Sequence, residues 1–180
     1  MRFFTIRLLA VCLVFITING ILSAQEIKPS EVKAIMQKVA DRQIEHINDL
    51  YSGHKVPHHP LAWTKGALYV GMVKWAAMAD DDKYYTWLKS IGAENEWMLH
   101  KRQYHADDHT VGQMYAELYR KYGEEKMLEP TKKQFGFIMM PPSQSVLTWK
   151  TPYHQDRWNW CDALFISPPV WAKLYNITGE

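Results

Sequence analysis

Apolar residues recur at helical spacing through most of the chain, and no strand-like alternation of useful length interrupts them. Leu68, Met72, Trp75 and Ala79, for example, follow one another at intervals of four, three and four residues, which places them on one face of a helix. The pattern predicts an all-α chain. We expect six helices, at about residues 29–51, 66–79, 84–91, 111–122, 124–139 and 164–175.

Turn residues separate the predicted helices. Three aspartates at positions 80–82 end the second helix, Gly123 ends the fourth, and a proline pair at 141–142 stops the fifth. Pro168 and Pro169 lie near the start of the sixth helix, where proline is tolerated in a first turn and kinks the helix elsewhere.

The second, fourth and sixth helices resemble one another. They open on the apolar, aromatic-rich segments 66–69, 112–115 and 162–165, and each ends in a short polar turn. A unit of two helices that recurs about every 45 to 55 residues indicates helical hairpins stacked side by side.

Residues 1–24 follow a different pattern, with an apolar run behind a basic start. Arg2 and Arg7 precede the apolar run at residues 8–18, and Ser23 and Ala24 come just before Gln25. This order is typical of a secretory signal peptide, because the apolar run is too short to span a bilayer comfortably. We expect a cleaved leader and a periplasmic or secreted mature chain, residues 25–180. An uncleaved anchor helix is the alternative, and Cys12 lies inside the apolar run, which argues against a lipid anchor.

Composition excludes several classes of function. The chain has 21 basic and 19 acidic residues, and loss of the leader arginines makes the two equal, so we expect no nucleic-acid partner. Cys161 is the only cysteine outside the leader, which excludes an intramolecular disulfide in the mature chain and a cysteine-based zinc cage. We expect no cofactor, no metal and no integral membrane segment after leader removal. The 13% aromatic content fits either a core or a carbohydrate cleft.

Three clusters of polar and aromatic residues precede the three similar helices, at residues 63–66, 105–109 and 158–162. If alternate helices run parallel, these clusters meet at one end of the array, where helix N-termini favour negative charge. Asp107 and Asp162 would then share one mouth with Trp63 and Trp160. Two acids beside two tryptophans suit acid–base chemistry on a sugar ring.

Each of these residues also has a structural interpretation. Asp107 and Asp108 precede an apolar helix, and either acid fits the role of its N-cap. Asp162 has apolar neighbours in the sequence, so it is either satisfied by a structural partner or held there for chemistry. Trp160 fits a core position as well as a sugar platform. Three histidines at positions 54, 58 and 59 lie in a proline-broken loop without carboxylates, where solvation is expected instead of metal binding.

Three motifs carry a resemblance to a known group of enzymes. They are Trp-Thr-Lys-Gly at 63–66, His-Ala-Asp-Asp-His-Thr-Val-Gly-Gln at 105–113, and Trp-Cys-Asp-Ala-Leu-Phe at 160–165 before the proline pair. Together they resemble the unsaturated glycuronyl hydrolases of glycoside hydrolase families 88 and 105, most closely family 105. The resemblance implies an (α/α)6 toroid with its active site at the open end of the inner helices.

The resemblance also implies a mechanism and residue roles. In these enzymes an aspartate, protonated at the start, donates a proton to C4 of an unsaturated uronic acid and takes one from the water that attacks C5. The hemiketal then rearranges and releases the aglycone. By motif position, Asp162 is this acid and base and Asp107 is the second acid. The remaining residues expected to bind substrate are Trp63, Trp160, Asp108 and His154, the last at a spacing that differs from the family. Lys65 stands where Asn or Ser is expected, which indicates a changed contact.

The pattern predicts three hairpins, whereas the toroid has six. The family histidine and arginine that hold the substrate carboxylate would lie in the other half. We therefore expect residues 25–180 to be the N-terminal half of such a domain, inactive or nearly so as written, with apolar helix flanks that favour aggregation. Two other functions stay open: a non-catalytic helical carbohydrate-binding or scaffold module, and another (α/α)6 enzyme such as a polysaccharide lyase.

Overall fold

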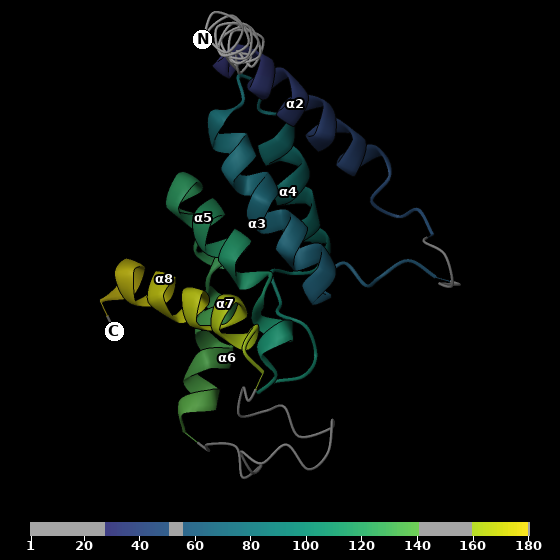
Figure 1. Ribbon diagram of the computed structural model, residues 1–180. Coiled ribbons are helices and arrows are strands. Elements are labelled where there is room, and N and C mark those ends of the chain that lie inside the picture. Colours follow the sequence, from purple (N-terminus) through teal and green to yellow (C-terminus); the bar gives the residue numbers. More distant parts are fainter. Residues whose placement is uncertain (1–27, 51–55, 141–159, 180) are drawn as a thin grey trace, which may run out of the picture. The chain divides into compact units, whose positions relative to one another are not determined.

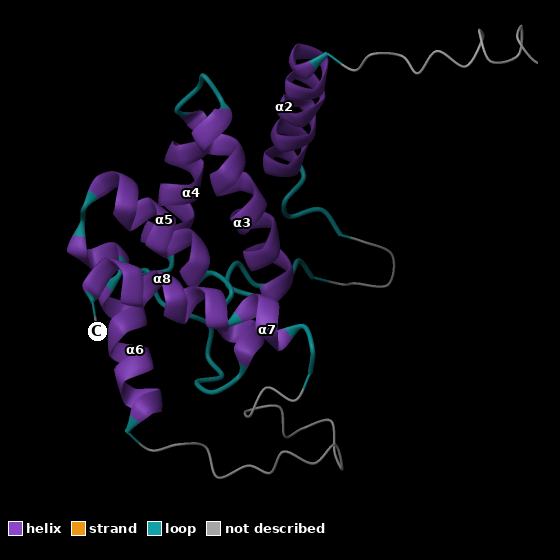
Figure 2. Cartoon of the chain, turned by 60° about the vertical axis from the view of Figure 1, so that its left-hand side comes forward, coloured by secondary structure: helices purple, strands orange, loops and turns teal. Residues whose placement is uncertain are grey.

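The computed structural model describes residues 28–50, 56–140 and 160–179. These residues are helical, with turns and loops between the helices and no strand among them (Figure 2). The all-α prediction is therefore confirmed. The elements are α2 (Pro29–Glu45), α3 (Trp63–Met78), α4 (Lys83–Glu94), η1 (Ala106–His109), α5 (Gly112–Tyr122), η2 (Glu125–Met127), α6 (Glu129–Met139), α7 (Ala163–Ile166) and α8 (Pro168–Thr178). Figure 1 labels the α-helices among them.

The chain divides into two units, residues 1–38 and 39–180. In the first unit, described residues 28–38 form the start of α2, which begins at Pro29. The end of this helix differs from the prediction, because α2 stops at Glu45 and residues 46–48 form a turn. All of the candidate site described below belongs to the second unit. Within the described residues, no helix combines the length and the apolar character needed to cross a bilayer.

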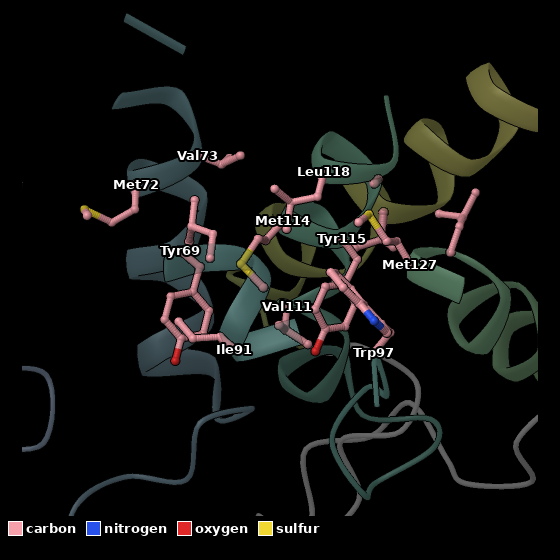
Figure 3. Packing of buried hydrophobic residues seen from close by; sticks show 14 of the residues in the cluster. Tyr69, Met72, Val73, Ile91, Trp97, Val111, Met114, Tyr115, Leu118 and Met127 are labelled. Carbon is pink, nitrogen blue, oxygen red and sulfur yellow. The ribbon is translucent and has the colours of Figure 1, made fainter. Parts of the chain in front are cut away.

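The core of the second unit lies between four helices. α3 packs against α4 and α5, and α5 packs against α8. Figure 3 shows Tyr69 and Val73 of α3 beside Met114 and Leu118 of α5, all of them buried. Aromatic edges join α3 to α4 as well, because the rings of Trp75 and Tyr84 meet at 5.7 Å in a T-shaped pair. This packing gives the N-terminal end of α3 a rigid support.

Glycine and proline set several helix ends. Gly123 adopts a left-handed conformation (φ 67°) and closes α5 by donating its N–H to the Tyr119 carbonyl, as its position in the sequence predicts. The sixth predicted helix is wrong as a single element, because the chain breaks at Ser167 into α7 and α8. Pro168 and Pro169 lack the N–H that a continuous helix needs. The fifth is divided in the same way, with η2 ahead of α6 and Pro130 in the first turn of α6.

A left-handed turn follows α4 and sets the direction of the chain toward η1. Glu96 and Trp97 have φ values of 54° and 58°, and the Trp97 N–H donates to the Gly92 carbonyl at 2.8 Å. The buried Trp97 ring packs against Gly92 and meets Tyr115 of α5 edge to face at 5.3 Å. A side chain at position 92 would place its Cβ 2.3 Å from this ring, so the turn requires glycine there.

Candidate active site

One cavity of about 170 Å³ collects residues from all three polar–aromatic clusters. Trp63 at the start of α3, Asp107 in η1, and Trp160 and Asp162 just before α7 line it, together with His105. The η1 element contacts both α3 and α7 here. The structure thus brings together four of the residues that the sequence predicts for a site, from three segments far apart in the chain.

The two tryptophans present partly open ring surfaces. Trp63 is 49% exposed and Trp160 is 41% exposed, although both line the cavity. Large aromatic rings that stay accessible beside a cavity suit stacking on a sugar ring. The alternative interpretation of Trp160 as a core residue does not fit this exposure.

Asp107 lies between a guanidinium and an imidazole. Its Oδ2 is 3.5 Å from Nη2 of Arg102 and 3.7 Å from Nδ1 of His105. The same His105 nitrogen accepts a hydrogen bond from the Asp107 backbone N–H at 3.3 Å. His105 therefore both caps η1 and forms part of the cavity wall. His105 was not among the predicted site residues, although its position two residues before Asp107 in the second motif was the available signal.

Asp108 has a different environment from Asp107. Its side chain is fully buried and accepts from the Arg102 backbone N–H at 2.7 Å, from Nε at 3.0 Å and from Nη2 at 2.6 Å. These bonds raise the pKa of Arg102 above its ordinary value, because they favour the charged guanidinium. The predicted contact of Asp108 with substrate is not what this geometry favours, since its carboxylate is occupied in holding the 102–108 loop.

Asp162 is exposed and occupies the N-cap position of α7 without making a side-chain capping bond. The burial suggested by its apolar sequence neighbours is not found, because Asp162 and Cys161 are both exposed and Ala163 is the buried one of the three. The Asp162 carboxyl group thus makes no capping bond to α7, and the residue lines the cavity.

Three side-chain groups attach α7 to the rest of the site, and we call them the α7 latch: His109, Gln113 and Ser167. Gln113 donates from Nε2 to the carbonyls of Phe165 and Ile166, both at 3.1 Å. Nδ1 of His109 lies 2.6 Å from Oγ of Ser167, and both side chains are fully buried. A helix of four residues has little stability of its own, so these bonds position it.

The protonation of His109 follows from its surroundings. Burial lowers the pKa of this imidazole, which favours the neutral ring. Nε2 lies 2.8 Å from the Gln103 carbonyl, which can only accept, so Nε2 carries the proton. Nδ1 then accepts from the Ser167 hydroxyl. His109 stands two residues after Asp107 and Ser167 five residues after Asp162, so the latch couples the positions of the two candidate acids.

Two other predicted residues lie apart from this cavity. Lys65 does not line it, and donates from Nζ to Oδ1 of Asn48 at 2.8 Å beside a second cavity. His154 lies outside the described residues. Within the described part of the chain, no group of three or more His, Cys, Asp or Glu side chains is arranged to hold a metal ion.

A family model described as Glycosyl Hydrolase Family 88 matches residues 35–180. The chain belongs to glycoside hydrolase family 88. This is one of the two families that the three motifs resemble.

Two relatives carry the same description, "Unsaturated 3S-rhamnoglycuronyl hydrolase". One, from Alteromonas sp. (strain LOR), is 30% identical over an alignment of 167 residues, and the match covers 84% of this chain and 40% of the relative. The other, from Formosa agariphila, is 32% identical over an alignment of 126 residues, and the match covers 64% of this chain and 32% of the relative. The chain therefore spans less than half the length of these relatives.

A solved structure described as a polysaccharide lyase has the same fold. It superposes with a TM-score of 0.66 at 22% identity, over 84% of this chain and 42% of the solved one. At this level of identity the likeness concerns the fold alone. The predicted fold class, all-α helical hairpins that form about half of an (α/α)6 toroid, is confirmed.

Proposed function

We propose that the chain supplies the acidic part of a site that hydrates unsaturated uronic acids at the ends of oligosaccharides of the rhamnogalacturonan type or a related one. Membership of family 88 supports glycosidase chemistry. The names of the two relatives support an unsaturated glycuronyl group linked to rhamnose as the substrate class. The observation that carries the proposal is the shared cavity, in which two carboxylates lie beside two accessible tryptophans.

The proposed roles follow from exposure and contacts. Asp162 is exposed at the cavity, so it is placed to give a proton to C4 of the substrate and to accept one from water. That water adds its oxygen to C5, and the hemiketal rearranges with release of the aglycone. Asp107, held near Arg102 and His105, is the second acid. Trp63 and Trp160 stack on the sugar rings.

The substrate carboxylate needs a cation that the described lining of the cavity does not supply. No Arg or Lys is among the described residues that line it, and the guanidinium nearest to Asp107, that of Arg102, is bonded to Asp108. We therefore expect the 180-residue chain to turn over substrate slowly or not at all while still binding it.

The test uses both the chain and a chimaera. In the chimaera, the matched part of this chain replaces the matched segment of the Alteromonas relative. Loss of the ultraviolet absorbance of the C4–C5 double bond measures hydration of an unsaturated disaccharide. We expect activity in the chimaera and a loss of at least a hundredfold on Asp162→Asn, because general acid–base catalysis contributes roughly 10²–10⁴ in rate. Asp82→Asn, at an exposed acid that makes no capping bond, is the matched control.

The 180-residue chain is tested for binding of the same disaccharide by calorimetry, in the wild type and in Trp160→Ala. Saturable binding that weakens in this variant supports the role of the cavity. Retained turnover in the Asp162→Asn chimaera would remove Asp162 from the proposed role. Binding without turnover in a folded chimaera would favour a non-catalytic carbohydrate-binding module.

The proposal includes export of the protein. The basic start, the apolar run and the small residues before Gln25 support a leader of 24 residues, all of which lie outside the described part of the chain. N-terminal sequencing of the protein recovered from the periplasm or the medium would test this, with Gln25 as the expected first residue.

A further inference from the structure

A second cavity, of about 140 Å³, lies on another side of the first turn of α3. Thr64, Lys65, Asp49 and His58 are among the polar residues that line it. Lys65 is only 7% exposed, and its Nζ donates to the neutral amide oxygen of Asn48 at 2.8 Å. Among the described residues, no carboxylate lies within 4.0 Å of this Nζ.

A buried ammonium without a counter-charge is costly, because its hydration is lost and no ion pair replaces it. Burial accordingly lowers the pKa of Lys65. A second polar group in the same turn is also unsatisfied, since Oγ1 of Thr64 is buried and has no hydrogen-bond partner in the described part of the chain. The cavity is therefore bordered by two buried side-chain donors that can make further hydrogen bonds: Nζ of Lys65 and Oγ1 of Thr64.

The backbone adds to this preference. Thr64 and Lys65 belong to the first turn of α3, a helix of 16 residues whose N-cap, Ala62, makes no side-chain capping bond. Unpaired N–H groups and the helix dipole favour an anion at such an end. The site does not depend on the helix end alone, because the buried ammonium and the unpartnered hydroxyl lie in the same turn.

One acid lines the same cavity, and its exposure limits its effect. The Asp49 side chain is 62% exposed, and its Oδ2 lies 2.6 Å from Nδ1 of His46. Water and this imidazole screen its charge, whereas the ammonium of Lys65 is buried and is screened much less. Of these two charged groups, the buried one is therefore the ammonium of Lys65.

We propose that this cavity is a binding site for a small oxyanion, either the carboxylate of a sugar acid or an inorganic oxyanion, held by Lys65 and Thr64. Nζ of Lys65 and the Thr64 hydroxyl donate to the oxygens of the anion. The volume far exceeds the roughly 10–15 Å³ that a single water needs. The site is separate from the one that holds Asp107 and Asp162, and it does not depend on the proposed hydrolysis. Lys65 is the residue that departs from the family pattern in the first motif.

Titration of the 180-residue chain with three probes tests this proposal. Sodium glucuronate, sodium sulfate and neutral glucose are added at constant ionic strength, and the ¹H–¹³C resonance of the Lys65 Cε, assigned with Lys65→Arg, is followed by NMR. We expect a saturable shift with at least one of the two anions and none with glucose. Lys65→Met should weaken binding at least tenfold. Lys74→Met is the matched control, since Lys74 is an exposed lysine of the same helix.

The outcomes separate the sources of the anion. Binding of glucuronate alone identifies a sugar-acid site and binding of sulfate alone an inorganic one, and both support the oxyanion site. A glucose-induced shift equal to that of glucuronate, equal losses in the two lysine variants, or no saturable shift would overturn it. If Lys65→Met fails to fold, Thr64→Val serves instead, with an expected loss of several-fold. Affinity should also fall as the pH rises through the Lys65 pKa, because only the charged ammonium attracts the anion.

Discussion

Gly92 offers a sharp test of how the chain is directed from α4 toward the candidate active site. Replacing it by alanine would put a Cβ 2.3 Å from Cζ3 and 2.5 Å from Cε3 of the Trp97 ring. Ordinary carbon–carbon contacts lie at about 3.5–4.0 Å, so the ring would have to move by more than about 1 Å. The ring is buried and Tyr115 lies against it, so little free space is available.

The magnitude follows from two opposing effects. Overpacking of a buried ring costs about 1–3 kcal/mol, and the higher helix propensity of alanine returns up to about 1 kcal/mol. We expect the upper part of the packing range, because the left-handed backbone at Trp97 limits relaxation. Gly92→Ala should therefore lower the free energy of unfolding by about 2 kcal/mol. The matched control is Gly71→Ala in α3, where a Cβ meets nothing within 4 Å and a gain of about 0.4–1 kcal/mol is expected.

Urea denaturation followed by circular dichroism measures both variants, with the slope checked for constancy. The double variant Gly92→Ala/Trp97→Leu should lose less stability than the sum of its single changes, because the shorter side chain removes the clash. A Gly92→Ala protein as stable as the wild type, or additive losses in the double variant, would contradict the packing of Trp97 described above.

Two further predictions concern the site. Asp108→Asn removes the charge that Arg102 contacts through its backbone and its side chain, so we expect the free energy of unfolding to fall by about 2–3 kcal/mol in urea denaturation. Asp82→Asn, the control, should stay within about 0.5 kcal/mol of the wild type. Equal effects of the two changes would contradict a stabilising role for the bonds between Arg102 and Asp108. The pKa of His109 is lowered from 6.5 by burial, so the unfolded chain takes up the proton first as the pH falls. Its contribution to stability is complete above about pH 6.5 and is lost toward the lower folded pKa. The urea midpoint should drop between pH 7.5 and 5.5, and a His109→Gln variant should show a flatter dependence; an equal slope in that variant would exclude His109 as the source.

Much of the fold was predictable because local chemistry determines it. Gly123 ends α5 in the left-handed conformation that glycine adopts most readily, and the apolar periodicity of α3 and α5 reflects their buried faces. The turn at Trp97 was not predictable, because neither Glu nor Trp favours a positive φ. It is held by burial of the indole against Gly92 and Tyr115, which is a tertiary effect.

In the candidate site, too, some features were predictable from the sequence and others depend on tertiary contacts. Regular placement of three clusters before similar helices was enough to predict that Asp107 and Asp162 share a cavity, and the structure places them so. Whether they carry the proposed chemistry stays a prediction. The pairing of Asp108 with Arg102 joins residues six apart in an irregular loop, where no periodic pattern indicates which carboxylate turns inward. For adjacent acids, sequence alone did not separate the one in the cavity from the one in the core.

The α7 latch has a consequence for how this site can be altered. Asp162 precedes a helix of four residues whose carbonyls are held by Gln113, 52 and 53 residues earlier in the chain. The position of Asp162 therefore depends on a side chain of α5, although Gln113 does not line the cavity itself. Substitutions at Gln113 offer a way to retune the spacing of the two acids remotely, leaving every residue of the cavity wall unchanged. The position of Asp162 is thus open to change through a residue outside the cavity.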